Sequence, residues 1–247
     1  MLAGTADPKR LAARAPKLAS LDTEPLELRD VDVVQVFSEI GSQGSEALLP
    51  PALHPTLPPI VSWLIYRCIS SPWGAFTLVQ TRISCRSGVR PRAYLVSGVI
   101  DNREAARALE SRWGFTLFEG DVGLHRNYHE IRIEASVNGS SILELGLREL
   151  DPLAPGDVQY VANMNAAFTP RGLRLVQVDP EYVVHRAERG APLIERFVPG
   201  AWGAETIEPV YPVSAAFTVA DLTFPRLRYV CRPDVPALEG TEPVQPG

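Results

Sequence analysis

Apolar and polar residues alternate along most of this chain, as expected for β-strands with one buried face. The segment 130–137 reads Glu-Ile-Arg-Ile-Glu-Ala-Ser-Val, and leucine occupies every second position from 143 to 147. Similar patterns predict strands at 31–37, 60–69, 75–84, 93–100, 158–168, 173–178, 182–186, 213–219 and 226–231. So many short strands predict a mainly β (α+β) fold, arranged as a sandwich or a barrel.

One segment has the signals of a helix instead. Asp101 and Glu104 form a capping-box pair ahead of an alanine-rich stretch. Gly114 follows that stretch as a C-terminal stop. The sequence therefore predicts one main helix at about 102–112, followed by a strand that starts near Phe115.

The two ends of the chain lack these patterns. Residues 1–26 are rich in Ala, Arg and Pro without apolar periodicity, and residues 233–247 contain four prolines in fifteen positions. Both segments are predicted to be flexible tails around a single domain at 27–232. Neither the first residues nor any other apolar run resembles a secretory signal or a membrane span.

Composition narrows the function and the setting. A net charge of −5 gives no positive field for nucleic acid or an anionic membrane. Cys68, Cys85 and Cys231 are widely spaced, which argues against disulfides and a zinc site and predicts a reducing cytoplasm. Only Lys9 and Lys17 of the 24 basic residues are lysines. With abundant Ala, Pro and Gly, this bias suggests a GC-rich genome and, by association only, secondary metabolism.

Residues 101–121 read DNREAARALESRWGFTLFEGD, and they resemble a segment of the acetoacetate decarboxylase-like superfamily. In that family a strand ends in an Asp-Asn-type turn, a short helix follows, and a Gly-Phe-Pro-Lys-Lys-type segment carries the catalytic lysine. Gly114 and Phe115 match this pattern if one residue is inserted before Gly114, and Leu117 and Phe118 stand at the lysine pair. The stretches LLPPALHPTLPPIVSWLIYR, WGAF and TFPRLRYVCRP are also similar, so the likeness spans about 30–232. It implies an acetoacetate decarboxylase-like antiparallel β-barrel or double sheet.

The departures from the family concern its chemistry. The family's lysine amine attacks a substrate ketone, and a neighbouring cation keeps that amine free of its proton. Leu117 has no nitrogen, Phe118 supplies no cation, and both lysines lie in the predicted tail. By the same alignment, Leu64 and Leu78 stand at two pocket glutamates. The sequence therefore predicts a protein without Schiff-base chemistry.

Leucines at three matched positions indicate either a hydrophobic substrate cavity or a filled core, and both alternatives stay open. Because side chains two positions apart on a strand share a face, Tyr66 and Cys68 should lie beside Leu64, and Phe76 and Gln80 beside Leu78. Tyr66 and Gln80 are predicted to supply polar contacts to the substrate, Tyr66 through a hydrogen bond to a carbonyl or enolate oxygen.

Further candidates come from the flanking positions. Glu119 or Asp121 is a candidate general base, unless it lies in water at a strand end. Trp63, Phe118 and Met164 are candidate cavity-lining residues beside Leu64, Leu78 and Leu117, although such residues more often pack a core.

No cofactor or metal is expected. His125 and His129 would lie about 13 Å apart on a strand, too far to share one ion. The serines lack the context of a hydrolase triad, and the scattered glycines form no phosphate or dinucleotide loop.

Three function classes remain. The first is an enzyme that cyclises or rearranges a hydrophobic, polyketide-like substrate through shape and hydrogen bonds. The second is a lyase, either a dehydratase or a decarboxylase that uses no Schiff base. The third is a small-molecule binding protein. The expected partner in each case is a hydrophobic small molecule, with a homo-oligomer possible and no nucleic acid or membrane involved.

Overall fold

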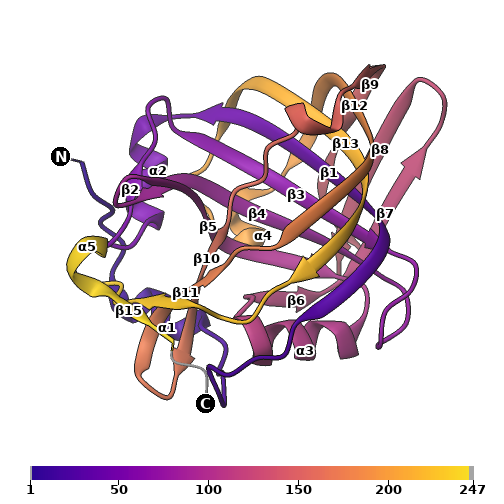
Figure 1. Cartoon of the computed structure of the whole chain (residues 1–247). Helices are drawn as coiled ribbons and strands as arrows, with labels where there is room; N and C mark the ends of the chain where they lie inside the picture. Colours follow the sequence, from indigo (N-terminus) through magenta and orange to yellow (C-terminus); the bar gives the residue numbers. More distant parts are fainter. Residues whose placement is uncertain (1, 245–247) are drawn as a thin grey trace.

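The alternating segments form one long, strongly curved sheet (Figure 1). This computed structural model describes residues 2–244 and confirms the mainly β class. The main strand order is β15-β14-β11-β10-β5-β4-β3-β1-β13-β12-β9-β8-β7. The two ends of this path, β15 and β7, are not paired with each other, so the sheet is not a closed barrel.

The strands, in chain order, are β1 Leu26–Ile40, β2 His54–Pro55, β3 Ile60–Cys68, β4 Phe76–Ser87, β5 Arg90–Ile100, β6 Leu117–Glu119, β7 Asp121–Arg126, β8 Glu130–Val137, β9 Ser140–Leu153, β10 Asn163–Thr169, β11 Gly172–Val178, β12 Glu181–Phe197, β13 Pro209–Phe224, β14 Tyr229–Cys231 and β15 Thr241–Pro243. The helices are α1 Pro8–Arg14, α2 Ser42–Leu48, α3 Arg103–Trp113, α4 Pro199–Trp202 and α5 Ala237–Gly240, with a 3₁₀ turn at Pro155–Asp157.

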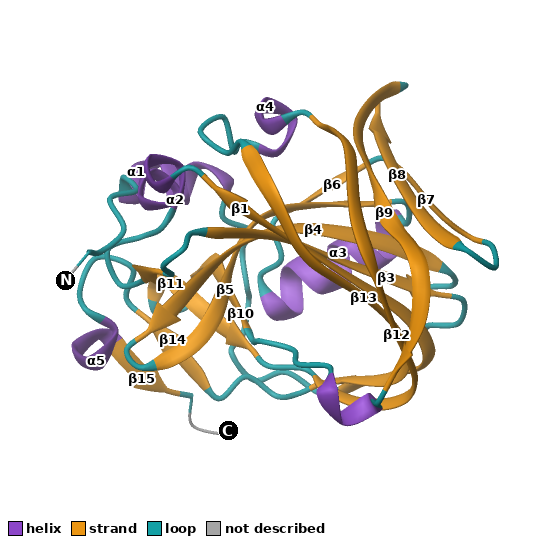
Figure 2. Ribbon diagram, turned by 90° about the horizontal axis from the view of Figure 1, so that it is seen from above, coloured by secondary structure: helices purple, strands orange, loops and turns teal. Residues whose placement is uncertain are grey.

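Both faces of the central strands are buried, because two separate cores cover them. On one face, β7–β9 fold back over β1, β3 and β4, so that Ile133 and Leu145 share a core with Trp63 and Val79. Figure 2 shows β7–β9 as a wall at the opposite end of the molecule from α1, α2 and α5. On the other face, α3 and the last strands enclose a second core. The candidate site lies on this second face.

Helix α3 agrees with the predicted helix to within one residue at each end. Its N-cap is Asn102, whose side chain accepts hydrogen bonds from the backbone N–H groups of Glu104 and Ala105. Asp101, which the sequence pattern suggested as the cap, instead accepts from the N–H of Thr77 at 2.7 Å. Gly114 ends the helix with a φ of 70°, the left-handed conformation that favours glycine.

The terminal segments differ from the loose tails that the sequence predicts. Leu11 and Leu18 are buried, and the backbone of Leu18 donates to the carbonyl of Phe168. At the other end, β15 pairs with β14, while residues 245–247 lie outside the described part of the chain. A tail without apolar periodicity can still pack where a few leucines meet a preformed surface.

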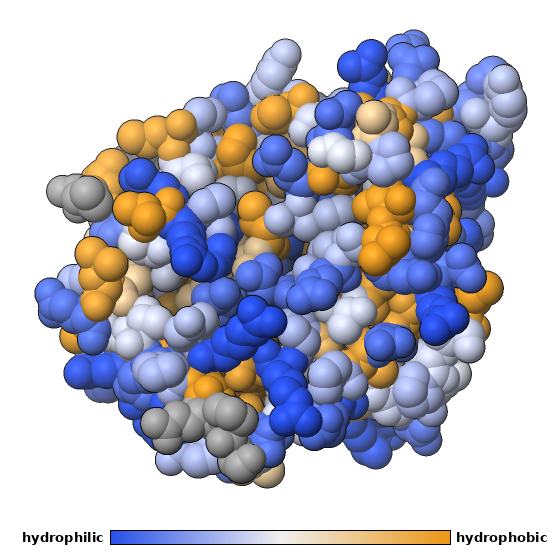
Figure 3. All heavy atoms as spheres, viewed as in Figure 1, coloured by the Kyte–Doolittle hydropathy of each residue, from blue (hydrophilic) through white to orange (hydrophobic). Residues whose placement is uncertain are grey.

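Two further observations concern the whole molecule. Cys68, Cys85 and Cys231 are free and buried. Within residues 2–244, no helix is both long and apolar enough to cross a membrane. Figure 3 shows hydrophobic residues scattered among hydrophilic ones across one face, without a continuous apolar surface.

Candidate functional site

Strand pairing brings four of the predicted site residues together. In the β3–β4 ladder, Leu64 lies opposite Gln80 and Tyr66 opposite Leu78. All four are buried, with at most 1% of each residue exposed. Directly opposed residues in a ladder point to the same face, so these side chains form one patch. The spacing rule applied to the sequence therefore gave the correct neighbours.

Leu117 joins this patch from the parallel strand β6. It pairs with Gly98 of β5, and a Cβ at Gly98 would lie only 2.8 Å from Leu117 Cδ2 and 3.2 Å from Leu78 Cδ1. Glycine is thus needed at 98 because the two leucines meet above it. The positions that the family resemblance assigned to the lysine and to one glutamate are neighbours in space, and both are apolar.

Beside the leucines lies a buried polar cluster, which we define as Tyr66, Gln80, Arg82, Asn163 and Tyr182. Asn163 of β10 connects this strand to β4. Its Nδ2 donates to Gln80 Oε1 at 2.7 Å, and its Oδ1 accepts from Arg82 Nη1 at 3.0 Å. The hydroxyls of Tyr66 and Tyr182 lie 2.5 Å apart. Arg82 follows Leu78 and Gln80 at two-residue spacing and so continues the same face of β4.

Arg82 is a buried cation without a counterion. Only 1% of the residue is exposed, and no carboxylate within residues 2–244 lies within salt-bridge distance of it. Its Nε and Nη2 have no hydrogen-bond partner, and neither does Gln80 Nε2. Burial lowers the pKa of Arg82, and the nearby Tyr66 and Tyr182 oppose that shift. Unpaired buried donors of this kind are costly, so they point to a negatively charged or oxygen-rich group that binds here.

The tyrosines of the cluster are neutral donors. Burial raises the pKa of Tyr66, while its bond to Tyr182 and the charge of Arg82 lower it by smaller amounts. Burial also raises the pKa of Tyr182 well above its ordinary value. Both hydroxyls therefore keep their protons at neutral pH. One of them donates to the other, so one hydrogen of the pair is free for a ligand oxygen, and neither hydroxyl acts as a base.

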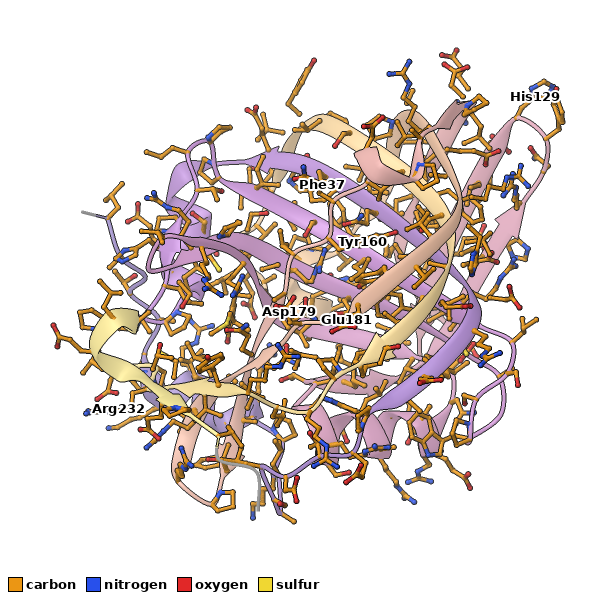
Figure 4. The ribbon with its side chains drawn as sticks, in the orientation of Figure 1. Phe37, His129, Tyr160, Asp179, Glu181 and Arg232 are labelled. Carbon is orange, nitrogen blue, oxygen red and sulfur yellow. The ribbon has the colours of Figure 1, made fainter. Side chains whose placement is uncertain are left out.

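Tyr160 covers the outer side of this arrangement. Its ring stacks on that of Tyr182 with centroids 3.7 Å apart, and its hydroxyl lies 2.5 Å from Thr218 Oγ1. Tyr160 belongs to the segment between the 3₁₀ turn and β10, and it lies in the middle of the view in Figure 4. A ligand that reaches Tyr66 must therefore displace or pass this pair of rings.

Three predicted lining residues lie on the opposite face of the sheet. Trp63, Phe118 and Met164 belong to or pack against the core under β7–β9. Trp63 points to the opposite side of the sheet from its neighbour Leu64, and the centroids of the Trp63 and Phe197 rings lie 5.2 Å apart. Strand alternation excludes these three from the face that carries Tyr66, so they are core residues there.

The predicted bases also lie away from the cluster. Glu119 Oε1 forms an ion pair with Arg103 Nε at 2.9 Å, and 57% of its side chain is exposed. Asp121 is exposed as well and accepts a long 3.4 Å hydrogen bond from Ser136 Oγ. β6 has only three residues, and Glu119 is the last of them, opposite the end of β5. The general-base assignment to Glu119 is therefore corrected: it is a solvated strand end.

The two lysines lie outside the cluster too. Lys9 is exposed in α1, and Lys17 is exposed where its backbone bridges to Phe168. Lys17 lines a surface pocket together with Thr116 and Leu117, but neither lysine belongs to the buried polar cluster.

We assign no metal site to the histidines. His125 and His129 are exposed, and Figure 4 shows His129 at the tip of the β7–β8 hairpin. One group of possible ligands, Asp30, His185 and Asp221, has its atoms within 4.8 Å of one another. Asp221 already accepts from the Asp30 N–H and pairs with His185, so we assign no metal to it.

Arg82, Asn163 and Tyr182 were not predicted from the sequence. The signal for Arg82 was present, since it continues the series Leu78, Gln80 on one face of β4. Asn163 and Tyr182 lie more than 80 residues further along the chain than Gln80 and Tyr66, and no local pattern brings them there.

No protein-family model matches the chain, and no curated protein matches it. Solved structures do match. Acetoacetate decarboxylase from Legionella pneumophila superposes with a TM-score of 0.73 at 16% identity, over 83% of this chain and 86% of that one. The enduracididine biosynthesis enzyme MppR, complexed with pyruvate, gives 0.69 at 16% identity, over 86% and 97%. An acetoacetate decarboxylase-like enzyme from Sphingomonas wittichii gives 0.66 at 16% identity, over 91% and 98%. The chain therefore has the fold of the acetoacetate decarboxylase-like superfamily, as its sequence predicted.

Proposed function

We propose that this protein is an enzyme that cyclises or rearranges a hydrophobic, polyketide-like substrate, and that the buried polar cluster stabilises an enolate-type oxyanion during the reaction. The observation that carries the proposal is Arg82, a fully buried guanidinium with two unpaired nitrogens. Donors fixed before the reaction stabilise charge that develops on an oxygen, because they need no reorganisation.

The residue types of the cluster favour this chemistry over covalent catalysis. A guanidinium stays protonated at neutral pH and so cannot attack a ketone. The cluster contains neither a carboxylate nor an imidazole to remove a proton. A β-dicarbonyl group is acidic enough to give up its α-proton to water, so its enolate forms without a strong base from the protein. Its enolate oxygen can be held by Arg82 and Tyr66 while the apolar chain packs beside Leu64, Leu78 and Leu117.

A lyase reaction is the second candidate, because decarboxylation also needs no base. Loss of carbon dioxide from a β-keto acid produces an enolate directly, and the same donors would stabilise it. Two structural neighbours are acetoacetate decarboxylases, and the structure of MppR contains pyruvate, a keto acid. These likenesses lie at 15–16% identity, so they support a shared scaffold for carbonyl ligands in our proposal and nothing finer.

The test uses a linear aryl 3,5-diketo thioester as substrate, followed by mass spectrometry and chromatography. Ring closure or rearrangement gives a new isomer of unchanged mass, or a product that has lost the thiol on lactonisation. The corresponding free 3,5-diketo acid is assayed in parallel, and its loss of carbon dioxide would support the lyase instead. Binding without conversion would identify a binding protein and end the enzyme proposal.

Arg82→Lys and Arg82→Met provide the matched variants. Lysine keeps a charge but loses the planar donors, whereas methionine keeps length and loses both. We expect turnover to fall in both and to be about 100–1000-fold lower in Arg82→Met. Equal turnover in wild type and Arg82→Met would remove the cluster from the reaction.

A further inference from the structure

A second pocket, of about 200 Å³, lies on the opposite face of the sheet from the buried polar cluster. It is bounded by α1, by the end of α2 and by the middle of β5. Tyr94 and Val96 of β5 line it, whereas Leu95 between them belongs to the core on the Tyr66 face. One layer of backbone therefore separates the two sites. The N-terminal segment that closes this pocket is tied to α2 by hydrogen bonds from Thr5 and Ala6 to Glu46 and Leu49.

The floor of the pocket carries a polar group that is not used in the fold. Tyr94 is 94% buried, since 6% of it is exposed, and its hydroxyl has no hydrogen-bond partner within residues 2–244. Burial raises the pKa of Tyr94, so its hydroxyl keeps its proton and remains a donor. A buried phenol usually has a partner, so an oxygen atom of a ligand would complete this site.

Arg14 supplies a positive charge at the same pocket. Its Nη1 makes a long 3.4 Å bond to the carbonyl of Trp202, and no acid within the described chain pairs with it. A Cβ at Gly203 would lie 1.3 Å from Arg14 Nη1, so the guanidinium lies directly against Gly203. The remaining walls are mostly apolar: Ala6, Leu11, Ala13, Leu48, Val96 and Ala166.

We propose that this pocket binds a small organic acid with a compact apolar body, such as an aromatic carboxylate. The carboxylate would accept hydrogen bonds from Arg14 and from the Tyr94 hydroxyl, and the ring would pack on Leu11, Leu48 and Val96. A volume of about 200 Å³ is below the range of drug-sized sites, so the ligand is a small metabolite. The inference is independent of the proposed reaction, because it concerns other residues on the other face.

Fluorine NMR on protein labelled with 5-fluorotryptophan gives a readout for each site. Trp202 reports on the second pocket through its contact with Arg14, and Trp113 reports on the Tyr66 face, where it packs against Phe224 at 5.2 Å. The chain has four tryptophans, so Trp202→Phe and Trp113→Phe assign the two signals. The probe is benzoate, with benzyl alcohol as a neutral ligand of the same shape.

Benzoate should shift the Trp202 signal in a saturable way, with a Kd on the order of 1 mM for so small a ligand. The wild-type protein should bind benzyl alcohol at least about tenfold more weakly than benzoate. The affinity for benzoate should fall at least about tenfold in Arg14→Gln and about threefold to tenfold in Tyr94→Phe. Tyr66→Phe should leave the titration unchanged. The proposal would be overturned if the Trp202 signal did not move or if only the Trp113 signal shifted. It would also be overturned if Arg14→Gln and Tyr94→Phe both bound benzoate as tightly as the wild-type protein does.

Discussion

Arg82→Met should lower turnover about 100–1000-fold without destabilising the protein, and this pairing follows from the position of the arginine. A side chain held in place for stability normally has its charge paired and its donors satisfied. Arg82 has one bond, to Asn163, two unpaired nitrogens and no acid. Its burial therefore costs free energy that the fold does not recover, as expected where a ligand is to complete the site.

The magnitude can be bounded from similar changes. Replacing a buried ionic group by an apolar residue of similar size typically raises the free energy of unfolding by about 1–4 kcal/mol. Asn163 Oδ1 would lose its hydrogen-bond donor, which lowers the free energy of unfolding by about 1–3 kcal/mol. The two ranges nearly cancel, so we expect a net gain of about 0.5 kcal/mol, the difference of their midpoints, equivalent to a rise in Tm of about 1–2 °C for a chain of this size.

Urea unfolding and thermal melts measure this gain, and Arg67→Met is the matched control. Arg67 also lies on a central strand, but its Nε donates to Asp32 at 2.8 Å and its Nη1 to the Leu124 carbonyl at 2.9 Å. Removing it leaves Asp32 without its partner, so this variant should lose about 1–3 kcal/mol. If Arg82→Met is destabilised as much as Arg67→Met, Arg82 is a structural residue and the ligand argument fails.

Three further changes test other parts of the reasoning. Tyr66→Phe should lower turnover about 10–1000-fold while changing stability by about 1 kcal/mol, and parallel kinetics and melts separate the two effects. Borohydride with acetoacetate should leave the mass of peptides 60–130 unchanged, because no lysine lies there; an adduct on such a peptide would contradict it. Burial raises the pKa of Cys85 from 9.0 to about 12, so the folded state keeps a proton that the unfolded chain loses above pH 9. Stability should fall from pH 9 to 12 by up to about 1.4 kcal/mol per pH unit, and less steeply in Cys85→Val, as measured by unfolding at each pH.

Local patterns predicted the elements of this fold well where one rule dominates. β8 spans Glu130–Val137, the same bounds as its alternating segment, because one face meets the core and the other meets water. The full length of the two longest strands was not predicted from the sequence. β12 and β13 run 17 and 16 residues, far beyond the short segments predicted, since their outer parts are exposed and carry little alternation.

The site was predicted in part for the same reason. Two-residue spacing placed Tyr66 beside Leu64 and Gln80 beside Leu78, and the β3–β4 register then joined both pairs. Arg82 obeys the same spacing, but a charged residue is almost never fully buried, so composition argues against it. Glu119 also shares the parity of Leu117, yet β6 ends there and the side chain meets Arg103 in solvent. Spacing gives the face of a strand, whereas depth depends on where the strand ends.

The relation between Leu117 and Arg82 explains how such a site can differ from the lysine chemistry of the family it resembles. A catalytic amine must be free of its proton, which requires a dry pocket and a nearby cation that lower its pKa. Here the apolar surroundings remain, with Leu78 and Leu117 meeting over Gly98. A permanent cation, Arg82, lies two residues from Gln80 and four from Leu78 along β4. A guanidinium in that setting gains nothing from losing its proton and forms no bond to carbon. In the reaction we propose, the same desolvation that would make an amine nucleophilic instead strengthens the field of Arg82 on an oxyanion, so that catalysis would be electrostatic rather than covalent.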